Sequence, residues 1–231
     1  MVSIILPVHN AERFVLQALA SIHSQTYTAY EIVVIDGGST DGTATLIRKA
    51  DKVRFITQPG SGLADAWNAG LAAANGEYIC FIDSDDLWPP YKLDIQVAYL
   101  EQHPEIEYVV GFVTYFVEPG CQPPPQMRAE IFSGAHVGYM PGTLMARRGL
   151  FRRLGGFGAE WEITPDVEWV ARMQAEDVPR AVLPQVLLNK RVHETNLSTV
   201  AGPALIKREL LRLLKSSLDR RRASHEPDRA R

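Results

Sequence analysis

Three carboxylates lie within four residues at Asp83-Ser84-Asp85-Asp86. Carboxylates this close repel one another, and holding them together in a partly desolvated cleft without a cation is costly. A hard divalent ion removes the repulsion, and Mg²⁺ is typically bound by one or two carboxylates together with substrate phosphate oxygens. The cluster therefore predicts a site for Mg²⁺ or Mn²⁺ and an anionic ligand. The alternative is an acidic helix start, in which Asp85 or Asp86 only caps the next helix.

Polar residues also follow two earlier apolar runs. Pro7-Val8-His9-Asn10 ends the first run, and Asp36 ends the second. A single Asp after a strand is equally well explained as a turn residue. Three polar strand ends at one edge of a parallel sheet indicate a ligand site, because ligands of open α/β sheets bind outside the carboxyl ends of the strands.

The elements that position these residues alternate along the first hundred residues. Apolar runs predict strands at 2–8, 31–36, 53–57 and 77–83. Helical periodicity predicts helices at 11–24 and 43–49, a helix after Gly62 that runs through 74, and a helix from Pro89-Pro90 to about 102. Asn10 is the expected N-cap of the first helix. This alternation predicts a parallel sheet with helices on both faces.

The second half is less regular. It predicts strands at 108–117, within 138–146 and at 182–190, and helices at 147–154, 165–174 and 205–218. The last helix carries an apolar stripe of Ile206, Leu210, Leu213, Leu214 and Leu218. Residues 119–126 are proline-rich and predict a surface loop, and the polar tail after Arg220 predicts disorder.

The overall composition is that of a soluble globular domain. The chain has 231 residues and a formal net charge of −3, which points to no polyanionic partner such as a nucleic acid. Its two cysteines, Cys80 and Cys121, suggest neither a disulfide framework nor a metal-ligand spacing. Because no signal peptide is recognisable and no apolar run approaches about 18 residues, a cytoplasmic location is expected.

Four segments resemble the successive motifs of family 2 glycosyltransferases: residues 6–10 (LPVHN), 35–43 (IDGGSTDGT), 62–70 (GLADAWNAG) and 76–86 (GEYICFIDSDD). Each segment alone is a weak signal, but all four occur in the expected order and spacing. The resemblance implies a GT-A fold, which is a single Rossmann-like α/β domain with a mixed, mainly parallel central sheet flanked by helices. It also implies inverting, hexosyltransferase-like transfer from a nucleotide-sugar donor, with a UDP-sugar expected first.

The resemblance also implies roles for individual residues in binding the donor. The nucleotide-sugar site would consist of Pro7, Asn10, Asp36, Asp65, Asn68 and Asp83, with Asp36 accepting a hydrogen bond from the base. In the Asp-x-Asp-like cluster, Asp83 would contact the ribose or the metal, and Asp85 would ligate the metal. Two positions depart from the family pattern, because His9 replaces a common Tyr and Gly37 replaces a common second Asp. Both departures leave open which nucleotide base the donor carries.

The segment Pro165–Arg172 resembles the family's catalytic helix, with Pro165 in place of the usual first acid. The match assigns the role of general base to Asp166, whose basicity would need desolvation by Trp161 or Trp169, since the helix N-terminus favours the ionised carboxylate. The alternative is an Asp that only caps the helix. Segment 191–198 resembles a motif of some members and makes His193 a second candidate metal ligand, with a structural role as the alternative.

The predicted organisation is one catalytic domain over residues 1–200, in which 1–100 bind the nucleotide sugar and 101–200 bind the acceptor. Residues 201–231 form a basic amphipathic helix and tail, which either contact the inner membrane face peripherally or pack on the domain. The acceptor could be a saccharide, a lipid-linked sugar or a peptide, in polysaccharide or glycoconjugate biosynthesis. The main alternative is a nucleotide-sugar-binding protein without transferase activity. A dinucleotide oxidoreductase is disfavoured because no Gly-x-Gly-x-x-Gly follows the first strand.

Overall fold

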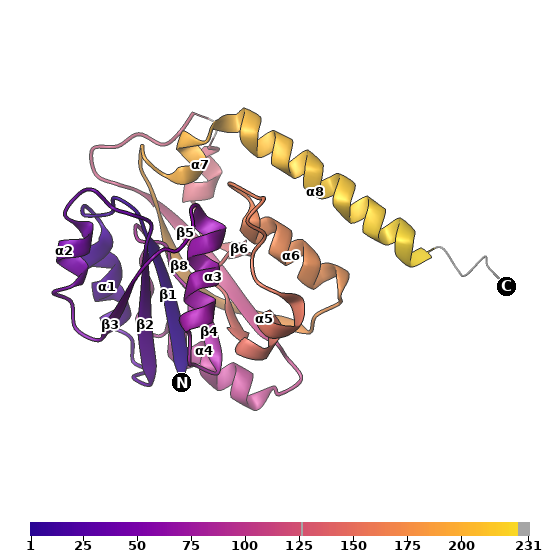
Figure 1. Ribbon diagram of the computed structural model, residues 1–231, viewed down its shortest axis with the longest axis horizontal. Helices are drawn as coiled ribbons and strands as arrows, with labels where there is room; N and C mark the ends of the chain where they lie inside the picture. The colour runs from indigo at the N-terminus through magenta and orange to yellow at the C-terminus, as the bar shows by residue number, and fades with distance from the viewer. Residues whose placement is uncertain (126, 226–231) are drawn as a thin grey trace.

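The computed structural model describes residues 1–125 and 127–225, and a mixed sheet runs through the molecule (Figure 1). Its strands are β1 (Val2–Val8), β2 (Tyr30–Asp36), β3 (Val53–Thr57), β4 (Tyr78–Phe81), β5 (Tyr108–Val117), β6 (His136–Gly138), β7 (Met145–Arg147) and β8 (Arg180–Val192). The strand order is β3-β2-β1-β4-β7-β5-β6, and β8 pairs with β5. The predicted α/β fold is therefore confirmed.

The sheet divides into a parallel region and a mixed region. Strands β3, β2, β1 and β4 are parallel neighbours, so their carboxyl ends lie along one edge. The next strand, β7, is antiparallel to β4 and to β5, whereas β8 is parallel to β5 over its whole paired length. Strands β4 and β8 therefore bring the acidic cluster and the segment ending at Val192 to the same side of the molecule, and the isolated bridge between Leu87 and Asn189 joins them there.

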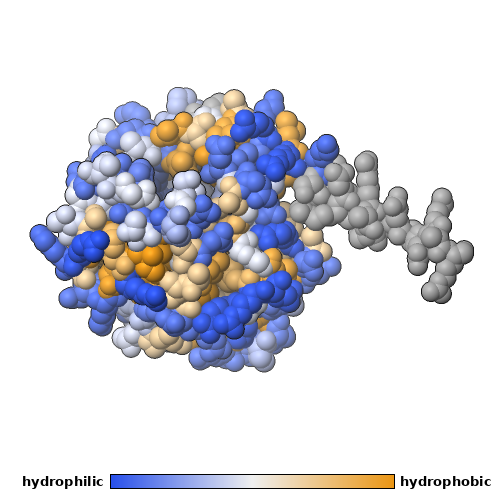
Figure 2. Space-filling model, viewed as in Figure 1, coloured by the Kyte–Doolittle hydropathy of each residue, from blue (hydrophilic) through white to orange (hydrophobic). Residues whose placement is uncertain are grey.

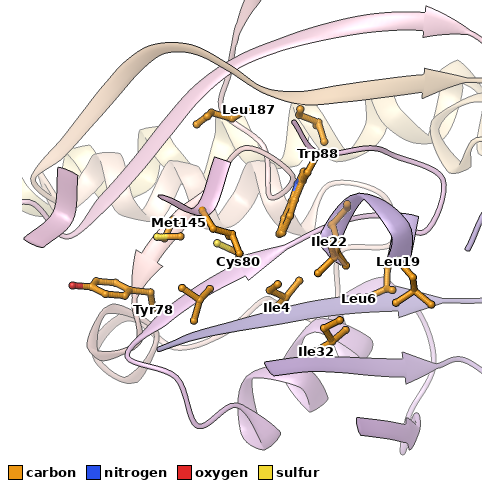
Figure 3. Packing of buried hydrophobic residues seen from close by; sticks show 14 of the residues in the cluster. Ile4, Leu6, Leu19, Ile22, Ile32, Tyr78, Cys80, Trp88, Met145 and Leu187 are labelled. Atoms are coloured by element: carbon orange, nitrogen blue, oxygen red, sulfur yellow. The ribbon is translucent and has the colours of Figure 1, made fainter. Parts of the chain in front are cut away.

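Helices cover both faces of the sheet. They are α1 (Val15–His23), α2 (Thr43–Ile47), α3 (Leu63–Ala73), α4 (Lys92–Gln102), α5 (Arg148–Leu154), α6 (Pro165–Ala175), α7 (Leu197–Val200) and α8 (Gly202–His225), together with the 3-10 helix η1 (Ala129–Phe132). Alternate residues of β1 point to opposite faces. Ile4 and Leu6 pack against α1, as Figure 3 shows, and Ile5 packs with α3 on the other face.

Every residue of β1 is buried, which explains why its sequence is a continuous apolar run and lacks a polar alternation. The face of α1 and α4 also holds Cys80 and Trp88. The opposite face contains a cluster of aromatic side chains in which Phe151 and Trp169 stack at 4.6 Å between ring centroids. That cluster joins α5 and α6 to the sheet and supports the start of α6.

Two local predictions were wrong. Helix α1 begins only at Val15 with Phe14 as its N-cap, because Asn10 adopts a left-handed conformation (φ 48°) and its side chain bonds elsewhere. Helix α8 continues to His225, so the disorder predicted just after Arg220 is not found there, and residues 226–231 lie outside the described residues. Its apolar stripe is not buried as a whole, since Leu213 is 6% exposed and Leu214 is 62% exposed.

Candidate active site

The acidic cluster directly follows the buried strand β4. One carboxylate oxygen from each of Asp83, Asp85 and Asp86 lies within 4.8 Å of the others. Asp86 is completely buried, and the next helix, α4, begins only at Lys92. The alternative in which Asp86 only caps a helix is therefore wrong. The three carboxylates instead form one compact, negatively charged site at the edge of the sheet.

Strand β8 supplies a positive charge to this site. The sequence analysis did not predict this charge. Lys190 Nζ donates to Asp86 Oδ2 at 2.9 Å and to Asp83 Oδ2 at 3.2 Å, and the backbone N–H of Arg191 donates to Asp86 Oδ1 at 2.9 Å. Burial raises the pKa of Asp86 to about 7 against the opposing effect of Lys190. Burial lowers the pKa of Lys190, but the three carboxylates outweigh it and hold that pKa well above its ordinary value.

Asp85 is held by the segment that follows β8. Its Oδ2 lies 2.9 Å from His193 Nε2 and accepts a hydrogen bond from Asn196 Nδ2 at 3.0 Å. His193 Nδ1 accepts from the backbone N–H of Thr195, so the bonding pattern assigns the ring proton to Nε2, which donates to Asp85. Burial raises the pKa of Asp85, but the hydrogen bond from His193 and the charge of Lys190 outweigh it and lower that pKa.

The donor set of this cluster fits a hard divalent cation. Asp83 and Asp85 are partly accessible and offer carboxylate oxygens, and the His193 ring lies against Asp85. Asp86 is less suitable, because Lys190 and the Arg191 backbone already occupy both of its oxygens. Ligation by His193 Nε2 would require the ring proton to move to Nδ1, where Thr195 Oγ1 at 2.9 Å is an available acceptor.

The predicted nucleotide residues at the ends of β1 and β2 lie beside one another. Pro7 is buried and pairs in register with Ile35, one residue before Asp36. Asp36 Oδ1 accepts from the backbone N–H of Ser39 at 3.0 Å and from its hydroxyl at 2.6 Å. Asn10 Oδ1 accepts from the backbone N–H of Thr40 at 2.8 Å. Asp36 and Asn10 therefore stabilise the turn after β2, and a bound base would have to use the other Asp36 oxygen.

The two predicted residues on α3 make different contacts. Asp65 Oδ2 accepts from the backbone N–H of Ser61 at 3.0 Å in the turn that precedes the helix. The Asn68 amide is paired on both sides with Phe157, donating to its carbonyl at 2.8 Å and accepting from its N–H at 2.9 Å. A Cβ on Gly156 would lie 2.1 Å from Asn68 Oδ1, so only glycine fits there. Asn68 thus joins α3 to the segment that follows α5.

Asp166 stands in the first turn of α6, at the edge of an apolar pocket. The pocket is lined by residues of β5, the 139–144 loop and α6, including Tyr108, Met140 and Trp169. Burial raises the pKa of Asp166 to about 6, and the charge of Asp83 adds to the rise. The desolvated environment that a general base needs is therefore present. The influence of Asp83 also means that the acidic cluster and Asp166 act on each other electrostatically.

This arrangement, with polar strand ends and an acidic cluster on one edge of a mainly parallel sheet, is that of a GT-A glycosyltransferase fold. Residues 1–349 of S. aureus TarS in complex with UDP-GlcNAc have a similar fold, with a TM-score of 0.70 and 21% identity, covering 87% of this chain and 61% of that fragment. The mannosyltransferase PcManGT of Pyrobaculum calidifontis, in complex with GDP-Man and Mn²⁺, has a TM-score of 0.62 and 24% identity, covering 82% of this chain and 56% of its own.

The model of glycosyl transferase family 2 matches residues 3–156, and the chain belongs to this family. An uncharacterized glycosyltransferase of Nostoc sp. is 40% identical over 97 residues, which are 40% of this chain and 30% of that protein. An uncharacterized glycosyltransferase of Rickettsia typhi is 28% identical over 214 residues, which are 87% of this chain and 67% of that protein. The matched regions thus span 30% and 67% of the length of these two relatives.

Proposed function

We propose that this protein is an inverting glycosyltransferase that moves a sugar from a nucleotide-diphosphate sugar to an acceptor hydroxyl with the help of a divalent metal. The observation that carries the proposal is the pairing of two groups in one site. A carboxylate cluster that could hold a cation follows β4, and the carboxylate of Asp166, whose pKa is raised, lies in the first turn of α6, close enough for the charge of Asp83 to affect it. Glycosyl transfer needs these two functions, a cation for the leaving diphosphate and a base for the acceptor.

The donor half would consist of residues 1–100 and the acceptor half of residues 101–200. Asp36 would accept a hydrogen bond from the base, with Pro7, Asn10 and Asp65 around the nucleoside. A UDP-sugar is the first donor to test, since the UDP-GlcNAc complex of TarS has the same fold. Because Asn68 is paired with Phe157, we expect it to support the nucleoside pocket from behind the site.

Asp83, Asp85 and His193 would hold Mg²⁺ or Mn²⁺, which neutralises charge on the diphosphate. Lys190 lies in the same cluster and balances part of the carboxylate charge before any cation binds. The Asp166 carboxylate would accept the proton of the acceptor hydroxyl. The acceptor oxygen then bonds to the anomeric carbon while the bond from that carbon to the diphosphate oxygen breaks on the opposite face, through an oxocarbenium-like transition state.

The substitution Asp166→Asn tests the base. The assay measures the release of UDP from UDP-GlcNAc, or from another UDP-sugar that the protein hydrolyses or transfers. We expect this rate to fall by about 10²- to 10⁴-fold, which is the usual contribution of a general base. Binding of UDP, measured by calorimetry with Mn²⁺, should be unchanged, because Asp166 does not touch the nucleotide in this assignment. Retained UDP binding together with normal turnover would contradict it. UDP binding without turnover in the native protein would instead favour a binding protein without transferase activity.

A thermal-shift screen tests the donor and the metal together. UDP should raise the melting temperature in the presence of Mn²⁺, and excess chelator should remove most of this shift, because ligands that bind only the folded state stabilise it. GDP, ADP and CDP serve as comparisons for the base. Asp85→Asn should lose the metal-dependent part of the shift, whereas Asp51→Asn on the distant turn before β3 should keep it. No response to any nucleoside diphosphate would count against the whole proposal.

We also propose that α7 and the exposed side of α8 contact an anionic membrane surface peripherally. None of the described helices is both long and apolar enough to span a bilayer. Val200, Leu211 and Leu214 are nevertheless 68%, 57% and 62% exposed, and Figure 2 shows apolar surface next to hydrophilic surface where α7 and α8 lie. Lys207 and Arg208 lie on the same helix and are exposed. Exposed leucines beside cations are typical of helices that bind membrane surfaces.

A further inference from the structure

Helix α8 directs one acidic side chain into the segment that precedes α6. Glu209 is 4% exposed, although most of its neighbours on α8 are exposed. Its carboxylate accepts hydrogen bonds from the backbone N–H groups of Glu162 (2.8 Å), Ile163 (3.1 Å) and Thr164 (2.9 Å), and from the Thr164 hydroxyl (2.9 Å). Four donors from three consecutive residues therefore converge on one side chain that lies 45 or more positions later in the chain.

These donors belong to the start of α6. Thr164 is the N-cap residue of the helix, but its side chain makes no cap hydrogen bond to its own helix and donates to Glu209 instead. Pro165 and Asp166 follow immediately. Glu209 thus takes the place of a local capping group, and its negative charge lies at the N-terminal end of α6, where the helix dipole favours it.

The contacts around Glu209 anchor the same segment from α8. Leu213, one turn further along, is buried, and the Arg212 guanidinium lies 4.4 Å from the centroid of the Trp161 ring. Arg212 Nη1 also donates to the Glu160 carbonyl at 3.3 Å. Residues 155–164 contain no helix or strand, so these side chains of α8 supply order that the segment does not obtain from secondary structure.

The carboxylate of Glu209 is suited to this role because it stays ionised. Burial raises its pKa, but the hydrogen bonds from Glu162, Thr164 and Ile163 outweigh burial and lower that pKa below its ordinary value. Hydrogen bonds to a charged acceptor are shorter and stronger than neutral ones. A neutral glutamine could not accept all four, since its amide nitrogen is a donor and would face at least one of the backbone N–H groups.

We infer that Glu209 is a positioning residue that fixes the first turn of α6 and thereby the carboxylate of Asp166 against the acceptor. This inference rests on the proposed function, in which Asp166 is the general base. It makes α8 part of the catalytic apparatus, whereas the sequence left open whether this helix packs on the domain or contacts a membrane. A group held one ångström from its productive position can cost a reaction about 10²-fold, so the anchoring of this turn matters for the rate.

The experiment compares Glu209→Gln, Asp166→Asn and the double variant. The assay measures the release of UDP from a UDP-sugar that the native protein hydrolyses or transfers. Glu209→Gln should lower kcat by about 10- to 100-fold and leave UDP binding with Mn²⁺ unchanged, because the donor site lies on other elements. In the Asp166→Asn background the same substitution should cause no further loss, since its effect passes through Asp166. Glu162→Gln is the matched control, because it breaks only the exposed ion pair with Arg208 and keeps the backbone donor.

Hydrogen–deuterium exchange over residues 161–168 gives a readout independent of activity. Glu209→Gln should speed exchange in this segment, and Thr164→Val, which removes one of the four donors, should lower kcat less and in the same direction. If Glu209→Gln does not fold, the kcat and the exchange rates of Thr164→Val test the inference in its place. Normal kcat in Glu209→Gln and Thr164→Val, or a multiplicative loss in the double variant, would overturn the inference. Normal turnover of Asp166→Asn would refute the assignment of the base itself, whatever Glu209 does.

Discussion

Asp166 is the residue whose chemistry depends most on its surroundings. As an ordinary aspartate at a helix N-terminus it would be a weak base, because the helix dipole favours its ionised form. In this fold the apolar pocket around Trp169 and the charge of Asp83 act in the opposite direction, and the pKa rises to about 6. A carboxylate with that pKa is still ionised at neutral pH and accepts a proton more readily than an exposed one.

The pH dependence of turnover follows from this shift. The acid form of Asp166 cannot accept a proton, so kcat/KM should fall about tenfold per pH unit below roughly pH 6 and be level above it. Without the shift, the fall would begin about two units lower, near the ordinary value for aspartate. The residual activity of Asp166→Asn should lack this fall at low pH. Measuring UDP binding over the same pH range separates protonation of Asp166 from a loss of donor binding at low pH. An acid limb that persists in Asp166→Asn would contradict the prediction.

At the scale of elements, the close packing of α3 on β1 positions the strand that carries Pro7 and ends at the proposed nucleotide site. Gly70 makes this approach possible, because a Cβ there would lie 2.3 Å from Ile5 Cγ2 and 3.0 Å from Cγ1. Ile5 is completely buried, so neither the helix nor the strand can move aside without disturbing the core.

Gly70→Ala should therefore destabilise the protein by about 1–3 kcal/mol, the usual cost of overpacking a core, although alanine favours helix by up to about 1 kcal/mol. Gly149→Ala is the matched control, because Gly149 is also helical and a Cβ there meets nothing within 4 Å. Urea unfolding followed by circular dichroism measures both. Gly149→Ala should leave the free energy of unfolding unchanged or raise it. Equal free energies of unfolding for the two variants would show that α3 and β1 can move apart at little cost.

At the scale of the whole molecule, one surface of α7 and α8 is apolar and basic while the rest of the chain is acidic. From residue 201 onward basic residues outnumber acidic ones, and the chain as a whole has a formal charge of −3. An acidic protein is repelled by anionic lipid except at a surface where Lys and Arg side chains cluster. Contact with a membrane would therefore be confined to this surface and would present the adjoining acceptor half to a lipid-linked substrate.

Vesicle sedimentation tests the membrane contact. The protein should bind vesicles containing anionic phosphatidylserine and not vesicles of phosphatidylcholine alone, and binding should weaken in high salt. Substituting Leu211 and Leu214 by Asn should reduce binding by about 10-fold or more, since each leucine loses apolar burial worth about 1.5–3 kcal/mol at most. Leu16→Asn is the control, because Leu16 is 48% exposed on α1. Equal binding of all variants would mean that α8 is no membrane element.

Local pattern in the sequence was enough to predict the sheet and the acidic cluster. The apolar runs that became β1, β2 and β5 were placed within a residue of their observed bounds. For β1 and most of β2 the reason is burial on both faces, which leaves a continuous apolar signature. The predicted clustering of Asp83 and Asp85 followed from adjacency in the chain. Helix ends were less well predicted, since Asn10 found a hydrogen-bond partner in the turn after β2 and did not cap α1.

Only the tertiary structure decided which charges meet. Lys190 and Asp86 are 104 positions apart, Asp85 and His193 are 108 apart, and Glu209 reaches the start of α6 from 45 or more positions away. No spacing rule connects residues that far apart, because their approach depends on how β8 pairs with β5 and how α8 crosses α6. The acidic cluster was thus determined by the sequence alone. Its neutralising lysine, the raised pKa of Asp166 and the anchoring of α6 arise from burial and long-range contacts that exist only in the folded chain.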